Sequence, residues 1–159
     1  MVRDAQPDEL NGIGDLRVAA YRADGFLPAT SGYAATLRSL GADGQAEVLA
    51  AVDGGQVVGT VTLQGWPAGQ MARGPGEAEV RALAVAPGAR GRGVGAALVA
   101  AVIERAAGQG IRQLVLLTLP DMRAAHRLYG QAGFSRLPDR DWSPRPGEVL
   151  LAYGLVLAP

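Results

Sequence analysis

The stretch Arg90-Gly91-Arg92-Gly93-Val94-Gly95 combines three alternating glycines with two arginines, directly before a segment with helical periodicity. Glycines there let the free N–H groups of a helix N-terminus approach an anion without Cβ clashes, and the helix dipole attracts it. The stretch therefore predicts a phosphate-binding loop. The spacing differs from the Gly-x-Gly-x-x-Gly of dinucleotide-binding folds, since position 96 is alanine, and a Walker-type Gly-Lys-Ser/Thr ending is absent. Dinucleotides and nucleoside triphosphates are therefore disfavoured as ligands.

Two elements must position this loop. The run Glu77 to Val85 predicts a strand, which opens through Pro87 into the loop. The segment after the loop predicts a helix that ends near Gly108 or Gly110. Apolar residues follow at i, i+3, i+4, i+7 and i+8 and mark one buried helix face: Val94, Ala97, Leu98, Ala101 and Val102. The unit is a strand, a glycine loop and a helix.

The chain before this unit predicts a short strand, a helical arm and a hairpin. The strand covers positions 2–5, and a first helix runs from Pro7 to Tyr21, weakened by Gly12 and Gly14. A second helix, capped by Thr30 or Ser31, runs to Leu40. Residues 46–53 and 56–64 predict two antiparallel strands joined by Asp53-Gly54-Gly55, because these turn residues tolerate positive φ.

The chain after the unit predicts a strand, a helix and two more strands. Ile111 to Leu119 is the strand, and the helix covers 122–132, with Asp121 as its cap and Gly133 as its stop. The apolar run Val149 to Ala158 is about half of the ~20 residues that a membrane-spanning helix needs, so it predicts a buried strand. The order is β-αα-βββ-α-β-α-ββ, which indicates an α/β class with one mixed sheet and a single domain over 1–159.

Composition narrows the class of function. The chain has 15 basic and 15 acidic residues and no net charge, so no nucleic-acid or membrane partner is expected. Every basic residue is arginine, which excludes Schiff-base chemistry on lysine. The lack of cysteine excludes disulfides, thiolate nucleophiles and cysteine-based metal sites. The charged segment 1–9 lacks the apolar stretch of a signal peptide, and we expect a cytoplasmic location.

Two motifs together resemble the GCN5-related N-acetyltransferase (GNAT) superfamily. The loop Arg90 to Gly95 matches the signature Arg/Gln-x-x-Gly-x-Gly/Ala, and the preceding run 79–87 is similar to the family's fourth strand. A second element, Ala-x-x-Leu-Tyr-x-x-x-Gly-Phe, is matched by Ala125, Leu128, Tyr129, Gly133 and Phe134. The chain departs at Met122, where relatives often carry an asparagine that contacts the pantetheine arm.

The resemblance implies a mixed sheet with splayed central strands and acetyl-CoA as co-substrate. Backbone groups around Leu83 and Val85 would then bond the acetyl-pantetheine arm between the fourth and fifth strands. The amides from Gly91 to Ala96, including those of Gly93, Val94 and Gly95, would cradle the pyrophosphate. Arg90 and Arg92 could add charge-assisted contacts. A solvated side chain is the alternative for Arg92, and an ordinary turn is the alternative for the loop.

The resemblance also assigns two catalytic candidates. Tyr129 matches the family position that gives a proton to the leaving thiolate, and the alternative is a core aromatic. Glu79 stands where many relatives carry a glutamate that deprotonates the acceptor amine, directly or through water. Glu77 projects to the same strand face, and both could instead be solvated carboxylates. His126, the only histidine, is more typical of a surface or packing residue.

Aromatic residues gather where relatives cover the acceptor. Tyr21, Phe26 and Tyr33 lie in and around the predicted helical arm, while Trp66 and Trp142 lie in loops that could close the other side. Packing of the arm onto the sheet is the alternative use of these rings.

These patterns lead to one expected activity, acetyl transfer from acetyl-CoA to a small-molecule or peptide amine by direct attack in a ternary complex. No metal is implied, and a homodimer is left open. The rivals are a coenzyme A-binding regulatory module without turnover, and an enzyme that acylates hydroxyls or uses longer acyl chains. The acceptor itself is not encoded in a recognisable motif. An acidic lining of its cavity would indicate a cationic amine, and an arginine lining would indicate an amino acid or an acidic metabolite.

Overall fold

The structure is a computed structural model that describes residues 1–27 and 32–157. Its described residues form one sheet in the order β1-β2-β3-β4-β5-β7-β6. The strands are β1 (Val2–Asp4), β2 (Glu47–Asp53), β3 (Gln56–Gly65), β4 (Glu77–Val85), β5 (Gln113–Thr118), β6 (Ser135–Arg136) and β7 (Leu151–Val156). The helices are α1 (Leu10–Ala23), α2 (Tyr33–Ser39), α3 (Val94–Gly108) and α4 (Arg123–Gln131). The predicted class and element order are confirmed.

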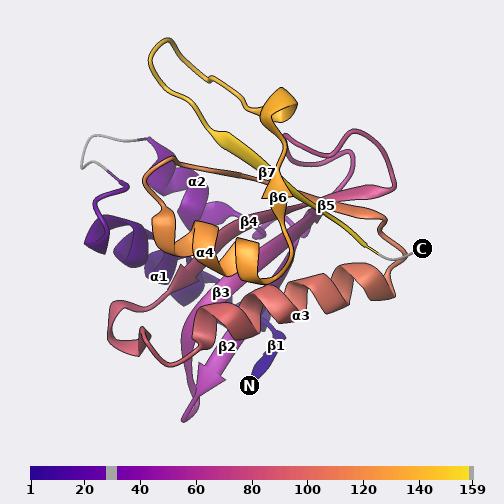
Figure 1. Cartoon of the computed structure of the whole chain (residues 1–159). Helices are drawn as coiled ribbons and strands as arrows, with labels where there is room; N and C mark the ends of the chain where they lie inside the picture. The colour runs from indigo at the N-terminus through magenta and orange to yellow at the C-terminus, as the bar shows by residue number, and fades with distance from the viewer. Residues whose placement is uncertain (28–31, 158–159) are drawn as a thin grey trace.

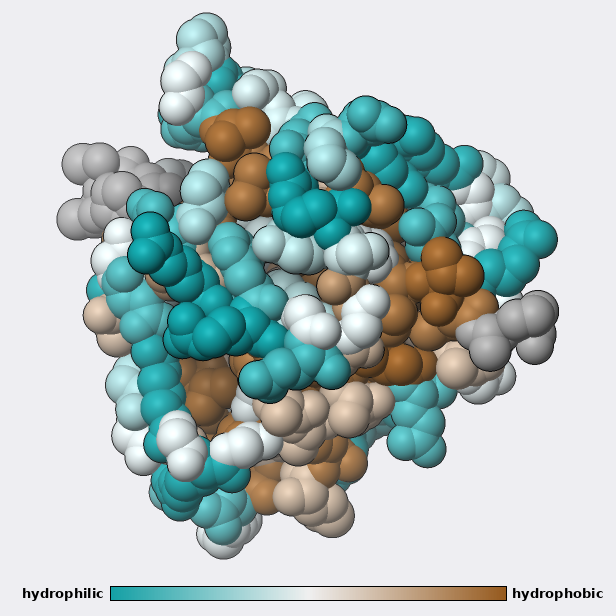
Figure 2. All heavy atoms as spheres, viewed as in Figure 1, coloured by the Kyte–Doolittle hydropathy of each residue, from teal (hydrophilic) through white to brown (hydrophobic). Residues whose placement is uncertain are grey.

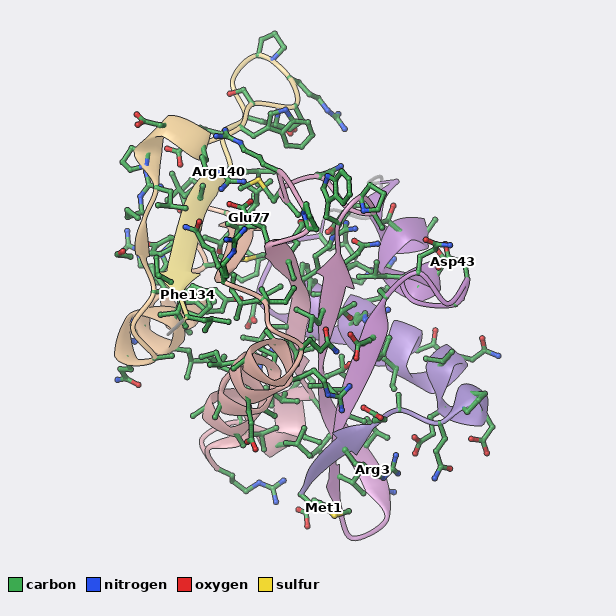
Figure 3. The ribbon with its side chains drawn as sticks, turned by 90° about the vertical axis from the view of Figure 1, so that its right-hand side faces the viewer. Met1, Arg3, Asp43, Glu77, Phe134 and Arg140 are labelled. Carbon is green, nitrogen blue, oxygen red and sulfur yellow. The ribbon has the colours of Figure 1, made fainter. Side chains whose placement is uncertain are left out.

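The helices lie on both faces of the sheet. Figure 1 shows α3 and α4 in front of the strands and α1 and α2 behind them, and Figure 3 shows the same layers from the side. The main core lies under α3, where Val61 and Val80 of the sheet pack with Leu98 and Val102. A smaller core joins α1, α2 and β4 through buried residues that include Val18, Leu37 and Ala82.

The two central strands separate after a short stretch of pairing. β4 and β5 pair in parallel only from Glu77–Gln113 to Glu79–Val115. Beyond that point β4 stays paired with β3 as far as Val85, while β5 stays paired with β7 as far as Thr118. The strands therefore splay, as predicted. Within β4 a bulge sets Ala82 and Leu83 opposite the single residue Val61, and Ala82 adopts a φ of 54°.

Glycines allow one tight turn and one close contact between helices. Gly54 and Gly55 turn the β2–β3 hairpin with φ of 58° and 81°, as their positions predicted. Gly14 weakens α1 as an isolated helix, but a Cβ at this position would lie 2.5 Å from the carbonyl oxygen of Arg38 in α2. The glycine is therefore what allows α1 and α2 to pack closely.

Two local predictions are wrong. Asp121 does not cap α4, because the chain turns before the helix and the N-cap is Met122, which makes no side-chain capping bond. The run Val149 to Ala158 is not one buried strand, because β7 is shorter and Val149 and Val156 are 42% and 75% exposed. The predicted caps Thr30 and Ser31 lie outside the described residues, as does Ala158. No helix in 1–27 or 32–157 has the length and apolar character to cross a membrane.

Candidate active site

A cleft of about 620 Å³ opens where β4 and β5 separate. Its walls come from the end of β4, the glycine loop, α4 with the turn before it, and the C-terminal part of α1 with the residues that follow. Eight of the predicted cofactor residues line it: Leu83, Val85, Arg90, Gly91, Gly93, Val94, Gly95 and Ala96. Hydrophilic side chains gather over α4 beside this region, whereas the surface over α3 is largely apolar (Figure 2). The structure thus brings the glycine loop and the open edge of β4 into one cavity.

The glycine loop presents the amino end of α3 to the cleft. Gly91 and Gly93 both have a φ of 77°, which disfavours other residues, and Gly93 is the N-cap of the helix. The Gly93 carbonyl accepts the first hydrogen bond of the helix, from Ala97 N–H. The N–H groups that precede Ala97 in the first turn therefore have no acceptor within the helix. A Cβ at Gly95 would lie 2.8 Å from the Leu128 side chain, so this glycine lets α3 contact α4.

The two arginines of the loop have different surroundings. Arg90 lines the cleft and donates to Asp24 Oδ1 at 2.5 Å, and also to the carbonyl oxygens of Ala20 and Val85 at 3.4 Å. It therefore ties the loop to the end of α1. Arg92 instead pairs with Asp53 of the β2–β3 hairpin at 3.2 Å. Arg92 is absent from the cleft wall, in line with its alternative as a solvated side chain.

Tyr129 is buried in an aromatic cluster beside the cleft. Its side chain is 6% exposed, and its ring centroid lies 5.5 Å from that of Phe134 and 6.4 Å from that of Tyr153. The residue before it, Leu128, lines the cleft. Burial raises the pKa of the Tyr129 phenol. Tyr129 therefore keeps its proton at neutral pH and can only donate it.

Glu79 is engaged by the loop that follows β3. The residue is 3% exposed, and its Oε1 accepts hydrogen bonds from the backbone N–H groups of Gln70 and Met71 at 2.9 and 3.2 Å. Its Oε2 lies 3.7 Å from Arg81 Nε and accepts no hydrogen bond from the part of the chain that the structure describes. Oε1 therefore holds the loop that contains Gln70 and Met71, whereas Oε2 can still accept a hydrogen bond.

Glu77 and His126 are held by contacts away from the cleft. Both carboxylate oxygens of Glu77 accept hydrogen bonds from Arg140, at 2.9 and 3.0 Å (Figure 3). Those hydrogen bonds hold the pKa of Glu77 below its ordinary value. His126 Nε2 lies 3.0 Å from the Leu119 carbonyl oxygen, and its ring centroid lies 5.4 Å from that of Tyr153. Neither residue lines the cleft.

The aromatic residues divide between two places. Tyr21 and Phe26 line the cleft, as expected for the arm. Trp142 lines a separate cavity of about 450 Å³ formed by the 70–73 and 139–142 segments. Trp66 is half exposed on the surface.

Sequence reasoning missed a group of polar residues between α1 and the sheet, foremost among them the buried Arg17 and the partly buried Arg81. Arg17 stands one turn after Ile13 on the buried face of α1, and that spacing is a detectable signal. Arg81 reaches its neighbours through the β3–β4 register, which the sequence pattern does not specify.

A model of the acetyltransferase (GNAT) family matches residues 15–134, which is most of the chain. The chain belongs to the GNAT family. Family membership makes it an acyltransferase, and no curated protein was found to match it.

Solved structures of GNAT proteins share its fold. An acetyltransferase of the GNAT family from Desulfovibrio desulfuricans is 23% identical, with a TM-score of 0.77 and 99% of each chain covered. The ribosomal-protein-alanine N-acetyltransferase from Brucella melitensis is also 23% identical, with a TM-score of 0.72 and 99% of each chain covered. A Salmonella typhimurium protein described as an acetyltransferase, solved with its cofactor acetyl-CoA, is 20% identical. Its TM-score is 0.71, with 100% of this chain and 94% of that one covered.

Proposed function

We propose that this GNAT protein transfers an acetyl group from acetyl-CoA to the nitrogen of an amine, by direct attack in a ternary complex. The observation that carries the proposal is the cleft in which the amino end of α3 and the unpaired edge of β4 face one another. Free N–H groups and a helix dipole suit the pyrophosphate, and a strand edge without a partner suits the amides of a pantetheine arm. Acetyl-CoA carries both groups on one molecule.

The donor set of this chain fits such a ligand. The amides from Gly91 to Ala96 would hold the pyrophosphate, with Arg90 adding a guanidinium at the same wall. Backbone groups of Leu83 and Val85 would hold the pantetheine arm, because β4 has no β5 partner at these residues. Acetyl-CoA supplies the activated acetyl group when it is bound.

We assign Tyr129 as the general acid. A phenol whose pKa is raised by burial stays protonated at neutral pH, so it can deliver a proton to the sulfur of the departing thiolate without placing a charge in the site. The position of Tyr129 supports this role, since the residue before it, Leu128, lines the cleft.

We assign Glu79 as the base, acting through its Oε2 atom. The Oε1 atom already accepts two backbone hydrogen bonds, so a proton from the acceptor amine would reach Oε2, directly or through a water molecule. Arg81, 3.7 Å from Oε2, would keep the carboxylate oriented.

The function is tested by ligand binding and by product analysis. Acetyl-CoA should raise the melting temperature, because a ligand that binds only the native state stabilises it, whereas NADH and ATP should do much less. Incubation with an amine panel should give N-acetylated products by mass spectrometry. Equal thermal shifts for the three ligands would remove the assignment. Tight acetyl-CoA binding with no transfer to any amine would favour a regulatory module.

A further inference from the structure

Polar side chains form a buried stripe on the sheet face beneath α1. Thr62 and Gln64 of β3 are buried, as is Glu79 of β4, and the register pairs Thr62 with Arg81 and Gln64 with Glu79. On the opposite face, Val61 and Leu63 of β3 pack in the apolar core under α3. Burying polar groups costs free energy unless they form hydrogen bonds or ion pairs. We therefore ask which partners these side chains have and what else they could bind.

Arg17 places a positive charge inside this stripe. It is 1% exposed, and it donates to the carbonyl oxygens of Leu37 and Leu40 at 2.8 and 2.9 Å and to Thr62 Oγ1 at 3.1 Å. No carboxylate among residues 1–27 and 32–157 forms an ion pair with it, and its Nε is buried without a hydrogen bond. Burial lowers the pKa of Arg17 to about 10, which leaves it charged at neutral pH.

Arg81 is a second, more accessible guanidinium next to Arg17. Its Nη1 donates to Gln64 Oε1 at 3.0 Å, and its Nε faces Glu79 Oε2 at 3.7 Å. Its Nη2 makes no hydrogen bond with the described part of the chain, and its side chain is 15% exposed. Gln64 therefore orients the guanidinium and leaves one N–H edge able to bind another group.

The balance of charge in the stripe is positive. Arg17 and Arg81 contribute two cations, whereas Glu79 is the one carboxylate in contact with them among the described residues. The neighbouring phenol of Tyr21 is neutral, since burial raises its pKa. Such surroundings repel a purely cationic amine and attract an anionic group.

The stripe adjoins the cleft proposed for acetyl-CoA. Arg81 lies two residues before Leu83, with the bulge between them, and Leu83 lines the cleft. Tyr21 also lines the cleft, and it lies one turn after Arg17 on α1. A small acceptor with its amine at the end of the cleft would therefore place a second group at Arg81.

We propose that the acceptor is a small amine that also carries a carboxylate, such as an α-amino acid, and that the Nη2 edge of Arg81 binds this carboxylate. The inference rests on the proposed function. In the transfer, the acceptor nitrogen forms a bond to the acetyl carbon as the carbon–sulfur bond breaks. One proton leaves nitrogen for Glu79 and another passes from Tyr129 to sulfur. The carboxylate is only bound, so Arg81 is a specificity residue.

The first test compares matched acceptors. Common amino acids, their α-carboxamides and the corresponding decarboxylated amines are assayed for acetyl-CoA-dependent acetylation. Charge-assisted hydrogen bonds predict a preference in kcat/KM for the carboxylated member of about 10- to 100-fold. The carboxamide has the less basic amine, so such a preference cannot arise from amine protonation. Equal use of all members, or preference for polyamines, would overturn the inference and leave the acetyltransferase assignment standing.

The second test changes the arginine. Arg81→Gln should lower kcat/KM for the carboxylated acceptor by about 10- to 100-fold more than for the carboxamide, because the lost contact with Glu79 affects both acceptors and the lost carboxylate contact affects only one. The affinity for acetyl-CoA should stay unchanged. Arg81→Lys should retain part of the preference. Arg38→Gln is the matched control, since Arg38 lies on the exposed side of α2 and pairs with Asp15 at 3.6 Å. Equal losses for both acceptors, or a large drop in melting temperature in both Arg81 variants, would assign Arg81 a structural role instead.

A binding measurement separates the two proposals. Calorimetry of the same matched acceptors with the CoA-loaded protein reports carboxylate recognition without turnover. Preference for the carboxylated member supports the inference even where transfer fails. Equal affinities overturn it even where transfer succeeds.

Discussion

Tyr129 and Glu79 are both almost fully buried, but their surroundings differ. Tyr129 is surrounded by Phe134 and Tyr153, and this apolar environment disfavours the phenolate. Glu79 instead contacts hydrogen-bond donors: two backbone N–H groups bond to its Oε1, and the guanidinium of Arg81 lies 3.7 Å from its Oε2. The environment of Tyr129 therefore suits the proton donor proposed there, and Glu79 keeps one carboxylate oxygen, Oε2, for the proposed role of base.

Tyr129→Phe should reduce kcat by about 10²- to 10⁴-fold, the usual range for a lost general acid. Acetyl-CoA affinity and the melting temperature should stay close to wild type, because the ring that packs against Phe134 is retained. The measurement is turnover at saturating acetyl-CoA with a cofactor titration on the same preparation. Tyr153→Phe, in the same aromatic cluster, is the control. Wild-type turnover of Tyr129→Phe would remove the general-acid role.

Glu79→Gln keeps a carbonyl oxygen for the amides of Gln70 and Met71 but removes the proton acceptor. We expect kcat to fall at neutral pH and the deficit to shrink as pH rises, because the acceptor amine then loses its own proton to solvent. The pH profile of kcat is the measurement. A deficit that is constant with pH and accompanied by a lower melting temperature would mean that Glu79 only anchors the loop.

At the scale of elements, β4 performs three tasks along one strand. Its first residues pair with β5, its middle carries Glu79 and Arg81 toward α1, and its end lines the cleft next to the glycine loop. The bulge at Ala82 makes this possible, because it sends Ala82 to the α1–α2 side and still leaves Leu83 at the cleft. Loss of the bulge would shift every later side chain to the other face.

The glycine loop can be tested with an isosteric pair. Gly93 has a φ of 77° and open space where a Cβ would lie, so Asn, which tolerates this conformation, should fit. Gly93→Asp adds a negative charge of the same shape where the pyrophosphate is proposed to lie. We expect Gly93→Asp to abolish the thermal shift by acetyl-CoA and Gly93→Asn to retain most of it. Equal shifts in both variants would mean that the loop is only a turn.

The segment before β7 is pinned by a titratable pair. Asp141 accepts two hydrogen bonds from Arg136 and one from Ala152 N–H, and the hydrogen bonds from Arg136 lower the pKa of Asp141 from 3.8 to about 2. The unfolded chain therefore binds more protons in this range, so this contribution to the free energy of unfolding is present above about pH 4 and is lost as pH falls toward 2.

Arg136→Gln should flatten that dependence, measured as denaturant unfolding between about pH 5 and pH 2. Arg145→Gln changes an exposed arginine in the neighbouring loop and should leave the slope as in the wild type. An unchanged slope in Arg136→Gln would show that Asp141 does not contribute to acid sensitivity.

For the whole molecule, short sequence patterns predicted the features that depend on residues close together in the chain. The alternating glycines, the hairpin turn and the apolar helix face encoded the loop, the β2–β3 connection and α3. The roles of Arg17 and Arg81 could not be predicted, because they depend on a strand register and on how α1 crosses the sheet. Asp121 is not the cap, because it lies in a turn closed by the hydrogen bond from Met122 N–H to the Leu119 carbonyl oxygen. The helix α4 therefore begins one residue later than predicted, with Met122 as its N-cap.

The short β4–β5 pairing makes the sheet two antiparallel halves, β1–β4 and β5–β7, that meet along a seam of three residue pairs. Because so few backbone hydrogen bonds join the halves, we expect the halves to separate at this seam at a lower free energy than either half unfolds. The cleft wall includes residues from both sides of the seam, such as Val85 and Leu128. Bound acetyl-CoA should therefore contact both halves and raise the free energy needed to separate them. Hydrogen exchange in low denaturant should show separate opening of β5 and β7 in the free protein and common opening with β4 once acetyl-CoA is bound, whereas identical exchange in both states would contradict this coupling.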